Sequence, residues 1–331
     1  MIRLCGAALL ASLLAGCQGT AGDPDGGTRA DAGPLFDAGP PPIKYDHYTQ
    51  RTDGWPTGAR VRGAAVLSNV LFVASDQGVL SLDATETRWK PVTTPLTGDV
   101  KPTSLIRVDQ SLVMTAAGAA GGGLYVKQFD GDWAQVTAAP TTPSWMVVKK
   151  STDYLLATTG GLFAATALSG PWVRRSVVNT AVFATPLTQL VAAPAQQKLF
   201  AHGATGGLFE SIDTGRTWTA SVPRGTVDAL TADRAIVVVS TSMDAQQRSD
   251  NYGNTFRAAA NPIGDGVVLY VSEGTRFWAA GAGGLKSSDD DGVTFTDNSD
   301  GLPVATAVRA LFFAGSYAIV DTADGPWINQ P

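Results

Sequence analysis

The sequence predicts an all-β fold, a seven-bladed β-propeller that occupies residues 45–331. Three observations predict it. Short apolar runs recur with a period near 41 residues, most of them are followed by a glycine turn and another strand, and aspartate outnumbers glutamate by 26 to three. Aspartate favours turns because its short carboxylate accepts hydrogen bonds from nearby backbone N–H groups. The skew therefore indicates a turn-rich chain with little helix.

Seven short apolar runs are the strongest repeat signal, and we expect each to form an inner strand of one blade. Their starts lie 41, 42, 44, 37, 41 and 41 residues apart. A four-stranded blade can bury its faces only against neighbouring blades, so short strands at this period are typical of a propeller. Six or eight blades remain alternatives to seven. The runs begin at Val70, Ser111, Asp153, Gln197, Arg234, Thr275 and Ser316.

The strand that follows most of the runs opens with a recognisable turn. In five repeats a glycine turn precedes a leucine, as in Gly78-Val79-Leu80 and Gly283-Gly284-Leu285. The last unit is incomplete because residues 305–331 supply only about three strands. We expect the segment from Tyr45 to Asp53 to provide the missing strand, since closing the ring removes an exposed sheet edge.

The turn after that strand carries a motif in three later repeats. Residues 211–218 match S-x-D-x-G-x-T-W at every fixed position; residues 288–295 have Phe for Trp, and residues 249–256 also have Asn for Asp. In this motif Ser and Asp accept backbone N–H groups across the turn, Gly takes a positive φ, and the aromatic ring packs between strands. We expect a structural role for Ser211, Asp213, Gly215, Thr217, Trp218, Ser249, Asn251, Gly253, Thr255, Phe256, Ser288, Asp290, Gly292, Thr294 and Phe295.

These motifs start 38 and 39 residues apart, in register with the repeat, and resemble the Asp-box (BNR-repeat) propeller family over essentially all of residues 45–331. The resemblance implies a sialidase-like fold. Catalytic sialidases of that family use three arginines on the substrate carboxylate, a tyrosine nucleophile paired with a glutamate, an aspartate acid/base and an early Arg-Ile-Pro motif. No Arg-Ile-Pro occurs here. We expect Glu86, Glu210 and Glu273 on the Asp-box side, away from the pocket, which argues against sialidase chemistry.

The first seventeen residues resemble a bacterial lipoprotein signal: Arg3, an apolar run over residues 4–14, and the lipobox Leu14-Ala15-Gly16-Cys17. The run is too short to span a bilayer as a helix. The resemblance implies cleavage after residue 16 and acylation of Cys17, and more than one acyl chain anchors a protein stably at about 0.8 kcal/mol per buried CH₂. Plain secretion is the alternative. Gln18 favours the outer membrane of a Gram-negative bacterium, with the protein facing the periplasm or the surface.

Residues 17–44 follow the signal as a lipidated cysteine and a tether. The segment is nearly pure Gly, Ala, Asp and Pro, with Asp-Ala-Gly-Pro at 31–34 and 37–40. Such a composition cannot bury enough apolar surface to order itself. As a flexible chain it would hold the propeller on the order of 30 Å from the membrane.

The composition excludes several classes of site. Both cysteines, Cys5 and Cys17, lie in the signal region, so the folded body has no thiol for catalysis or metal binding. Only two histidines are present, and a net charge of −5 with scattered Lys and Arg gives no footprint for nucleic acid. We expect no cofactor and no metal. The acidic run 289–291 has some likeness to a calcium loop, but it lacks a distal bidentate glutamate.

The sequence therefore favours a membrane-anchored, non-catalytic module that binds or assembles with a protein or glycan partner, with no catalytic residue. The alternative is a glycoside hydrolase-like enzyme, because paired aspartates about 5–10 Å apart can carry that reaction. His202 could act as a general base, but we expect a structural histidine. The loop aspartates expected on the pocket face are Asp76, Asp99, Asp228, Asp244, Asp265, Asp300, Asp321 and Asp324.

Overall fold

The fold was obtained as a computed structural model. It describes residues 45, 47–119, 121–150, 152–175, 187–192, 198–203, 207–221, 227–233, 235–241, 246–258, 267–273, 276–304 and 306–329. The predicted signal peptide, lipobox and tether lie outside the described residues, as do Asp244 and Asp265. The described residues include no helix long and apolar enough to cross a membrane.

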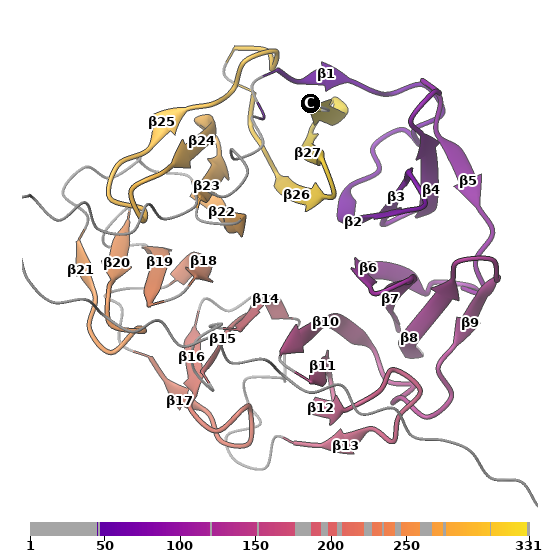
Figure 1. The fold of residues 1–331 in the computed structure, drawn as a ribbon, viewed down its shortest axis with the longest axis horizontal. Helices are drawn as coiled ribbons and strands as arrows, with labels where there is room; N and C mark the ends of the chain where they lie inside the picture. The colour runs from indigo at the N-terminus through magenta and orange to yellow at the C-terminus, as the bar shows by residue number, and fades with distance from the viewer. Residues whose placement is uncertain are drawn as a thin grey trace, which may run out of the picture. The chain divides into compact units, whose positions relative to one another are not determined.

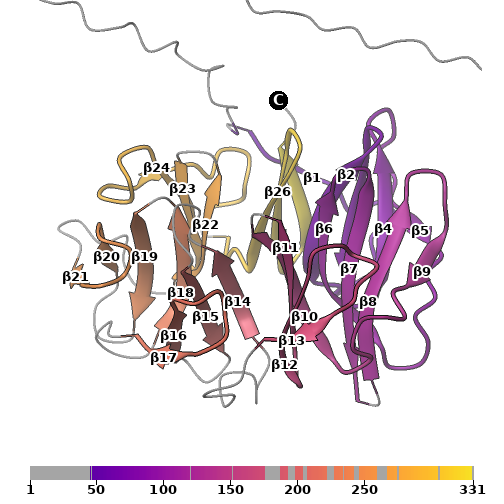
Figure 2. The same ribbon diagram turned by 60° about the horizontal axis from the view of Figure 1, so that its bottom comes forward.

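The described chain forms seven four-stranded antiparallel sheets arranged as the blades of one ring (Figure 1). The predicted seven-bladed all-β propeller is therefore confirmed. Blades 1 to 6 are β2–β5, β6–β9, β10–β13, β14–β17, β18–β21 and β22–β25 in chain order, and blade 7 combines β26–β28 with β1. In blades 1 to 6 the four strands are joined in sequence, so each of these blades is an antiparallel meander, whereas in blade 7 the N-terminal β1 pairs with β28. The strands of all blades run between the two faces of the disc (Figure 2).

The first strand of each blade lies nearest the centre of the ring in Figure 1, and the second strand pairs with it. The first strands are β2 (Val61–Leu67), β6 (Lys101–Val108), β10 (Ser144–Lys150), β14 (Leu187–Ala192), β18 (Val227–Asp233), β22 (Val267–Glu273) and β26 (Ala310–Ala314). The second strands are β3 (Val70–Ser75), β7 (Ser111–Gly118), β11 (Asp153–Thr158), β15 (Leu199–Gly203), β19 (Ile236–Thr241), β23 (Arg276–Gly281) and β27 (Tyr317–Thr322).

The third and outer strands become shorter toward the rim. The third strands are β4 (Gly78–Asp83), β8 (Gly121–Gln128), β12 (Gly161–Ala165), β16 (Leu208–Ser211), β20 (Gln247–Ser249), β24 (Gly284–Ser288) and β28 (Gly325–Asn329). The outer strands are β5 (Lys90–Val92), β9 (Trp133–Gln135), β13 (Val173–Arg174), β17 (Thr219–Ala220), β21 (Arg257–Ala258), β25 (Thr296–Asp297) and β1 (Thr49–Gln50).

The prediction that the apolar runs form inner strands is confirmed, and each run forms the second strand of its blade. A second strand has a blade packed on each of its faces, so successive side chains enter two different cores. In β3, Val73 packs into the core between blades 7 and 1, whereas Phe72 packs into the core between blades 1 and 2. Strands buried on both faces appear in sequence as nearly continuous apolar runs. The innermost strands are interrupted by exposed residues such as Arg62.

The N-terminal segment closes the ring, as predicted. Thr49 pairs with Ile328 and Gln50 with Trp327, so β1 becomes the outer strand of blade 7. Tyr45 and Tyr48 are buried beside this strand in the core between blades 6 and 7. The Tyr45 ring packs edge-on against Trp278, with centroids 5.9 Å apart. First and last segments of the chain thus share one blade.

Candidate functional site

The antiparallel meander gives the propeller two different faces. One face, here named the connection face, carries the turns between second and third strands and the segments that join one blade to the next. The other, named the box face, carries the remaining two turns of each blade. Residues 211–218, 249–256 and 288–295 form turns between third and outer strands on this box face, and we name them the box turns.

Each box turn is held by its own serine and by its acid or amide side chain. In the first, Asp213 Oδ1 accepts the backbone N–H groups of Arg216 and Thr217, both at 2.9 Å. Ser211 Oγ accepts the N–H of Gly215 at 2.7 Å. Burial opposes ionisation of Asp213, but the hydrogen bonds that its carboxylate accepts from Thr217, Ser211 and Arg216 lower its pKa overall. The same arrangement recurs with Ser249 and Asn251 and with Ser288 and Asp290.

The fourth residue of each box turn has left-handed backbone, at Thr214, Tyr252 and Asp291. A cation from the preceding blade reaches this residue in all three cases. Arg175 Nη1 donates to Thr214 Oγ1 at 2.7 Å, Lys198 Nζ to the Tyr252 carbonyl at 2.8 Å, and Arg248 Nε to the Asp291 carbonyl at 2.8 Å. The box turns therefore fasten neighbouring blades together as well as closing a hairpin.

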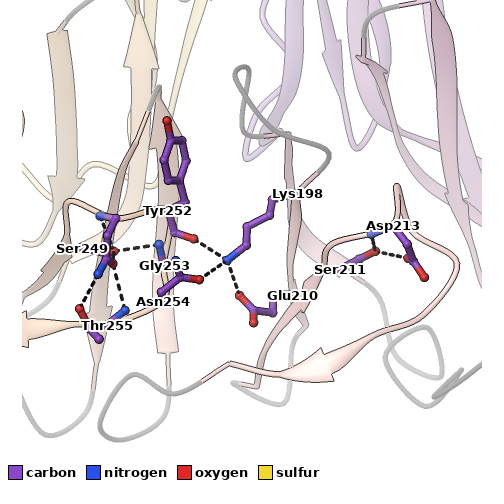
Figure 3. A network of polar contacts seen from close by, with 10 residues as sticks. Lys198, Glu210, Ser211, Asp213, Ser249, Tyr252, Gly253, Asn254 and Thr255 are labelled. Carbon is purple, nitrogen blue, oxygen red and sulfur yellow. Dashed lines mark hydrogen bonds and ion pairs between the residues drawn. The ribbon is translucent and has the colours of Figure 1, made fainter.

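Lys198 forms the most buried of these contacts (Figure 3). Its Nζ also donates to Asn254 Oδ1 at 2.8 Å and lies 3.4 Å from Glu210 Oε2. A buried ammonium is tolerated only when its donors are satisfied. With three acceptors around the Nζ, this lysine is accounted for by packing between blades 4 and 5 and leaves no free group for chemistry.

The box glycines permit the close approach of the preceding blade. Gly215 has φ +91°, and a Cβ built there would lie 2.2 Å from Leu162 Cδ2 of blade 3. Trp218 completes the contact: its ring is only 2% exposed and belongs to the core that contains Leu155 and Leu199. Phe256 and Phe295 are partly buried against the next two cores between blades.

The three acidic residues in the third box turn, residues 289–291, all bond to other groups of the protein. Asp290 accepts the N–H of Thr294 at 2.8 Å, and Asp289 forms a two-point pair with Arg276 at 2.6 and 3.0 Å. The carbonyl of Asp291 accepts from Arg248. Across the described ranges, no three His, Cys, Asp or Glu side chains gather in a way that could hold a metal ion.

The connection face shows a feature that the sequence analysis missed. In six blades the pairing of the innermost strand shifts by one residue near its start, as a β-bulge does. Bulges turn a side chain out of the regular alternation and are common beside functional sites. The positions recur every 40 to 43 residues, so the repeat period contains the signal, although no residue type marks it. The extra residues are Arg62, Thr103, Trp145, Thr188, Asp228 and Val268.

Positively charged residues lie at the start of the innermost strands, on the connection face, in three adjacent blades. Arg309 precedes β26 of blade 7, Arg60 and Arg62 stand at the start of β2 of blade 1, and Lys101 opens β6 of blade 2. All four residues are exposed. We name this set the axial arginine arc. Arg62 Nη2 lies 3.5 Å from Asp76 Oδ2, whereas within the described residues the Arg60 guanidinium has no hydrogen bond or ion pair.

Asp321 lies buried behind the arc, with only 1% of its surface exposed. Burial raises the pKa of its carboxyl to about 6, although the Val61 backbone N–H and the charges of Arg309, Arg60 and Arg62 lower it. Its Oδ1 has no hydrogen-bond partner among the described residues. A carboxyl with a pKa raised in this way costs folding energy when ionised, so stability is greatest below the unfolded pKa and is lost as the pH rises through about 6.

Asp321→Asn is therefore expected to stabilise the protein at pH 8 by about 1–3 kcal/mol, the free energy of a pKa shift of up to about two units. At pH 4.5, where the native carboxyl is mostly protonated, most of the gain should disappear. Thermal unfolding of both proteins at the two pH values measures this. Asp324→Asn, an exposed neighbour, is the control and should change stability by less than about 0.5 kcal/mol. A variant less stable than the parent at pH 8 would contradict the assignment.

The side chains of three other predicted loop aspartates are held by their surroundings. Asp76 Oδ1 accepts the N–H of Arg60 at 2.9 Å, Asp99 Oδ2 accepts the N–H of Ala119 at 2.6 Å, and Asp300 lies 3.3 Å from His47 Nδ1. Asp324 contributes its backbone carbonyl to Gln50. Asp76 and Asp321 meet at the same segment, residues 60–62. Asp228 occupies a bulge position in β18, and its side chain is outside the described part of the structure.

His202 and the glutamates take no part in the arc. His202 is 4% exposed, and its Nε2 lies 2.6 Å from the Val227 carbonyl oxygen of the next blade, as expected of a structural histidine. Glu273 ends β22 beside a first turn, Glu86 lies between β4 and β5, and Glu210 lies in β16. The prediction that all three glutamates fall on the box side is confirmed by this topology.

Comparison with known proteins gives structural neighbours only. No family model and no curated protein sequence matches the chain. YCF48 from Cyanidioschyzon merolae superposes with a TM-score of 0.63 at 14% identity, covering 86% of this chain and 98% of that one. YCF48 bound to D1 peptide gives 0.62 at 15% identity over 83% and 94%. Virginiamycin B lyase from Staphylococcus aureus gives 0.62 at 9% identity over 85% and 99%. At these identities the likeness shows that the chain shares the propeller fold.

Proposed function

We propose that this protein is a membrane-anchored lipoprotein whose propeller binds a protein partner through the connection face, without catalysis. A glycan partner is the alternative within the same role. In this proposal the acyl chains on Cys17 hold the protein in the outer membrane, with the propeller facing the periplasm or the surface; the lipobox and the tether support it. The box face serves the packing of the blades, which leaves the connection face for recognition.

The axial arginine arc is the observation that carries this proposal. Exposed arginines offer planar, multi-donor groups for a partner, and Arg is enriched in protein interfaces. Asp76, Asp99 and Asp300, by contrast, bond to groups of the propeller itself. The described connection face is therefore better equipped to hold an external group than to transform one.

The structural neighbours are compatible with this role. YCF48 has been solved with a D1 peptide bound, so a propeller of this general architecture can hold a peptide. The identity of 15% transfers no residue to the present chain. The structural likeness supports only the class of function, which is binding. Membership of the Asp-box family is part of the proposal and is based on the three box turns.

Cys17→Ser is expected to abolish membrane anchoring, because the acyl chains are the proposed anchor and no helix of the described part of the chain could cross a membrane. The parent should pellet with membranes and partition into detergent, whereas the variant should be soluble or unprocessed. Intact-mass spectrometry of the mature parent should show an acylated N-terminal Cys17. Cys5→Ser is the matched control and should leave the lipid in place. An unmodified N-terminus at any residue other than Cys17 contradicts the anchor.

The second candidate function is a glycoside hydrolase-like activity, and one observation favours it. Asp76 and Asp321 approach the same three-residue segment, and Asp321 has a pKa of about 6, as a general acid needs. Hydrolysis of a panel of nitrophenyl glycosides tests this candidate. Turnover that both Asp76→Asn and Asp321→Asn abolish, in variants that remain folded, would replace the binding proposal with the enzyme.

A further inference from the structure

We infer that the axial arginine arc binds carboxylate groups of an acidic protein segment. The inference rests on the proposed binding function and names the chemistry of the partner. It depends on the convergence of Arg60, Arg62 and Arg309 from the two ends of the chain at one edge of the ring axis. The closure of the ring by β1 makes blades 7 and 1 neighbours and so brings these residues together.

The charge balance of the arc favours an anion. The arc carries four cations, including Lys101; the charges of its three arginines act on Asp321, and Arg62 pairs with Asp76. Asp76 engages Arg62 and the backbone of Arg60, and Asp321 is buried. Neither carboxylate is therefore bonded to the guanidinium of Arg60. Arg309 Nη1 has one long contact, 3.4 Å to the Thr322 carbonyl, so most of its donors also remain available.

The geometry of these side chains suits carboxylates in particular. A guanidinium presents donors in a planar fork that matches the two oxygens of a carboxylate. The arc spans three blades, so several carboxylates spaced along a chain can be bound at once. The exposed large hydrophobic side chains found on the described surface are Phe129, Val173, Ile212, Val293 and Val304, and none belongs to the arc. The recognition is therefore electrostatic, which favours an acidic peptide over a neutral or aromatic-rich ligand.

An N-terminally fluorescein-labelled, C-terminally amidated hexaglutamate peptide is the probe. Fluorescence anisotropy with the full-length chain in mild detergent should show saturable binding at about 50 mM NaCl that weakens steeply by about 300 mM. Arg60→Gln with Arg309→Gln should weaken it at least about tenfold, a loss of about 1.4 kcal/mol. Both substitutions keep the backbone contacts, and unchanged melting temperatures verify the fold.

Arg174→Gln with Arg216→Gln is the matched control, since it removes two exposed arginines from a groove of about 460 Å³ beside blade 3. It should weaken binding less than about twofold. Equal losses in the two double variants, or no binding by the parent, would overturn the inference. Stronger binding of labelled tetragalacturonate than of hexaglutamate would also overturn it in favour of an acidic glycan. If hexaglutamate fails while a partner still cross-links to the connection face, the proposed function stands and only the acidic-segment assignment fails.

Discussion

Deleting residues 18–54 is expected to unfold the whole propeller at a temperature at which a chain lacking only residues 18–40 stays folded. The larger deletion removes β1 and thereby exposes the edge of β28, which pairs with it. It also removes Tyr45 and Tyr48, two of the largest fully buried side chains. Loss of one buried aromatic side chain typically costs about 3–5 kcal/mol, so loss of two approaches the total stability of a typical domain.

Thermal unfolding of the two deletion variants makes the comparison. Both retain the signal and Cys17, and they differ only in residues 41–54, so export and anchoring are matched. The damage should spread because each blade is stabilised by its neighbours. Equal melting temperatures would mean that the ring closes without the N-terminal strand, which would contradict the pairing of Thr49 with Ile328.

Trp218→Ala is expected to lower the stability by about 3–5 kcal/mol, because the ring fills the core between blades 3 and 4. Asp213→Ala should cost less, about 1–3 kcal/mol, since it leaves the N–H groups of Arg216 and Thr217 without their acceptor. Chemical denaturation of the three proteins gives both differences. Added Ca²⁺ should change none of them.

Ile212→Ala is the control for the box turn, because this side chain belongs to the same motif but is 66% exposed. It should cost less than about 0.5 kcal/mol. A loss at Ile212 as large as that at Trp218 would show that the turn is sensitive to any substitution. A stabilisation by Ca²⁺ that Asp290→Asn removes would show that the acidic run is a calcium site after all.

The architecture could be predicted because its determinants are local and repeated. Each blade needs apolar strands and glycine or aspartate turns within about 41 residues, so the period is visible in the sequence. The closing strand could be predicted for a different reason: the last repeat has three strands, and an unpaired sheet edge has to be covered. A continuous apolar run indicates a strand that is buried on both faces, which is a property of the second strand of each blade. It does not indicate how near the strand lies to the ring axis.

The axial arginine arc could not be predicted from the sequence. Arg309 lies almost 250 residues from Arg60 and Arg62 along the chain, and the basic residues are scattered when they are counted in sequence order. Ring closure brings them together. The bulges of the innermost strands were missed because five different residue types occupy the six positions, from Arg62 to Val268. A bulge is defined by backbone pairing, which leaves no common side-chain signature.

Site-specific photo-cross-linking in living cells tests the central claim most directly, namely that the connection face binds a protein. A benzophenone side chain is placed at Lys101, which opens β6 in the axial arginine arc, or at Phe129, which is 52% exposed on the box face. The proposed function predicts a discrete adduct with one envelope protein from position 101 and none from position 129. Adducts from position 129 alone, or no adduct from position 101, would contradict it.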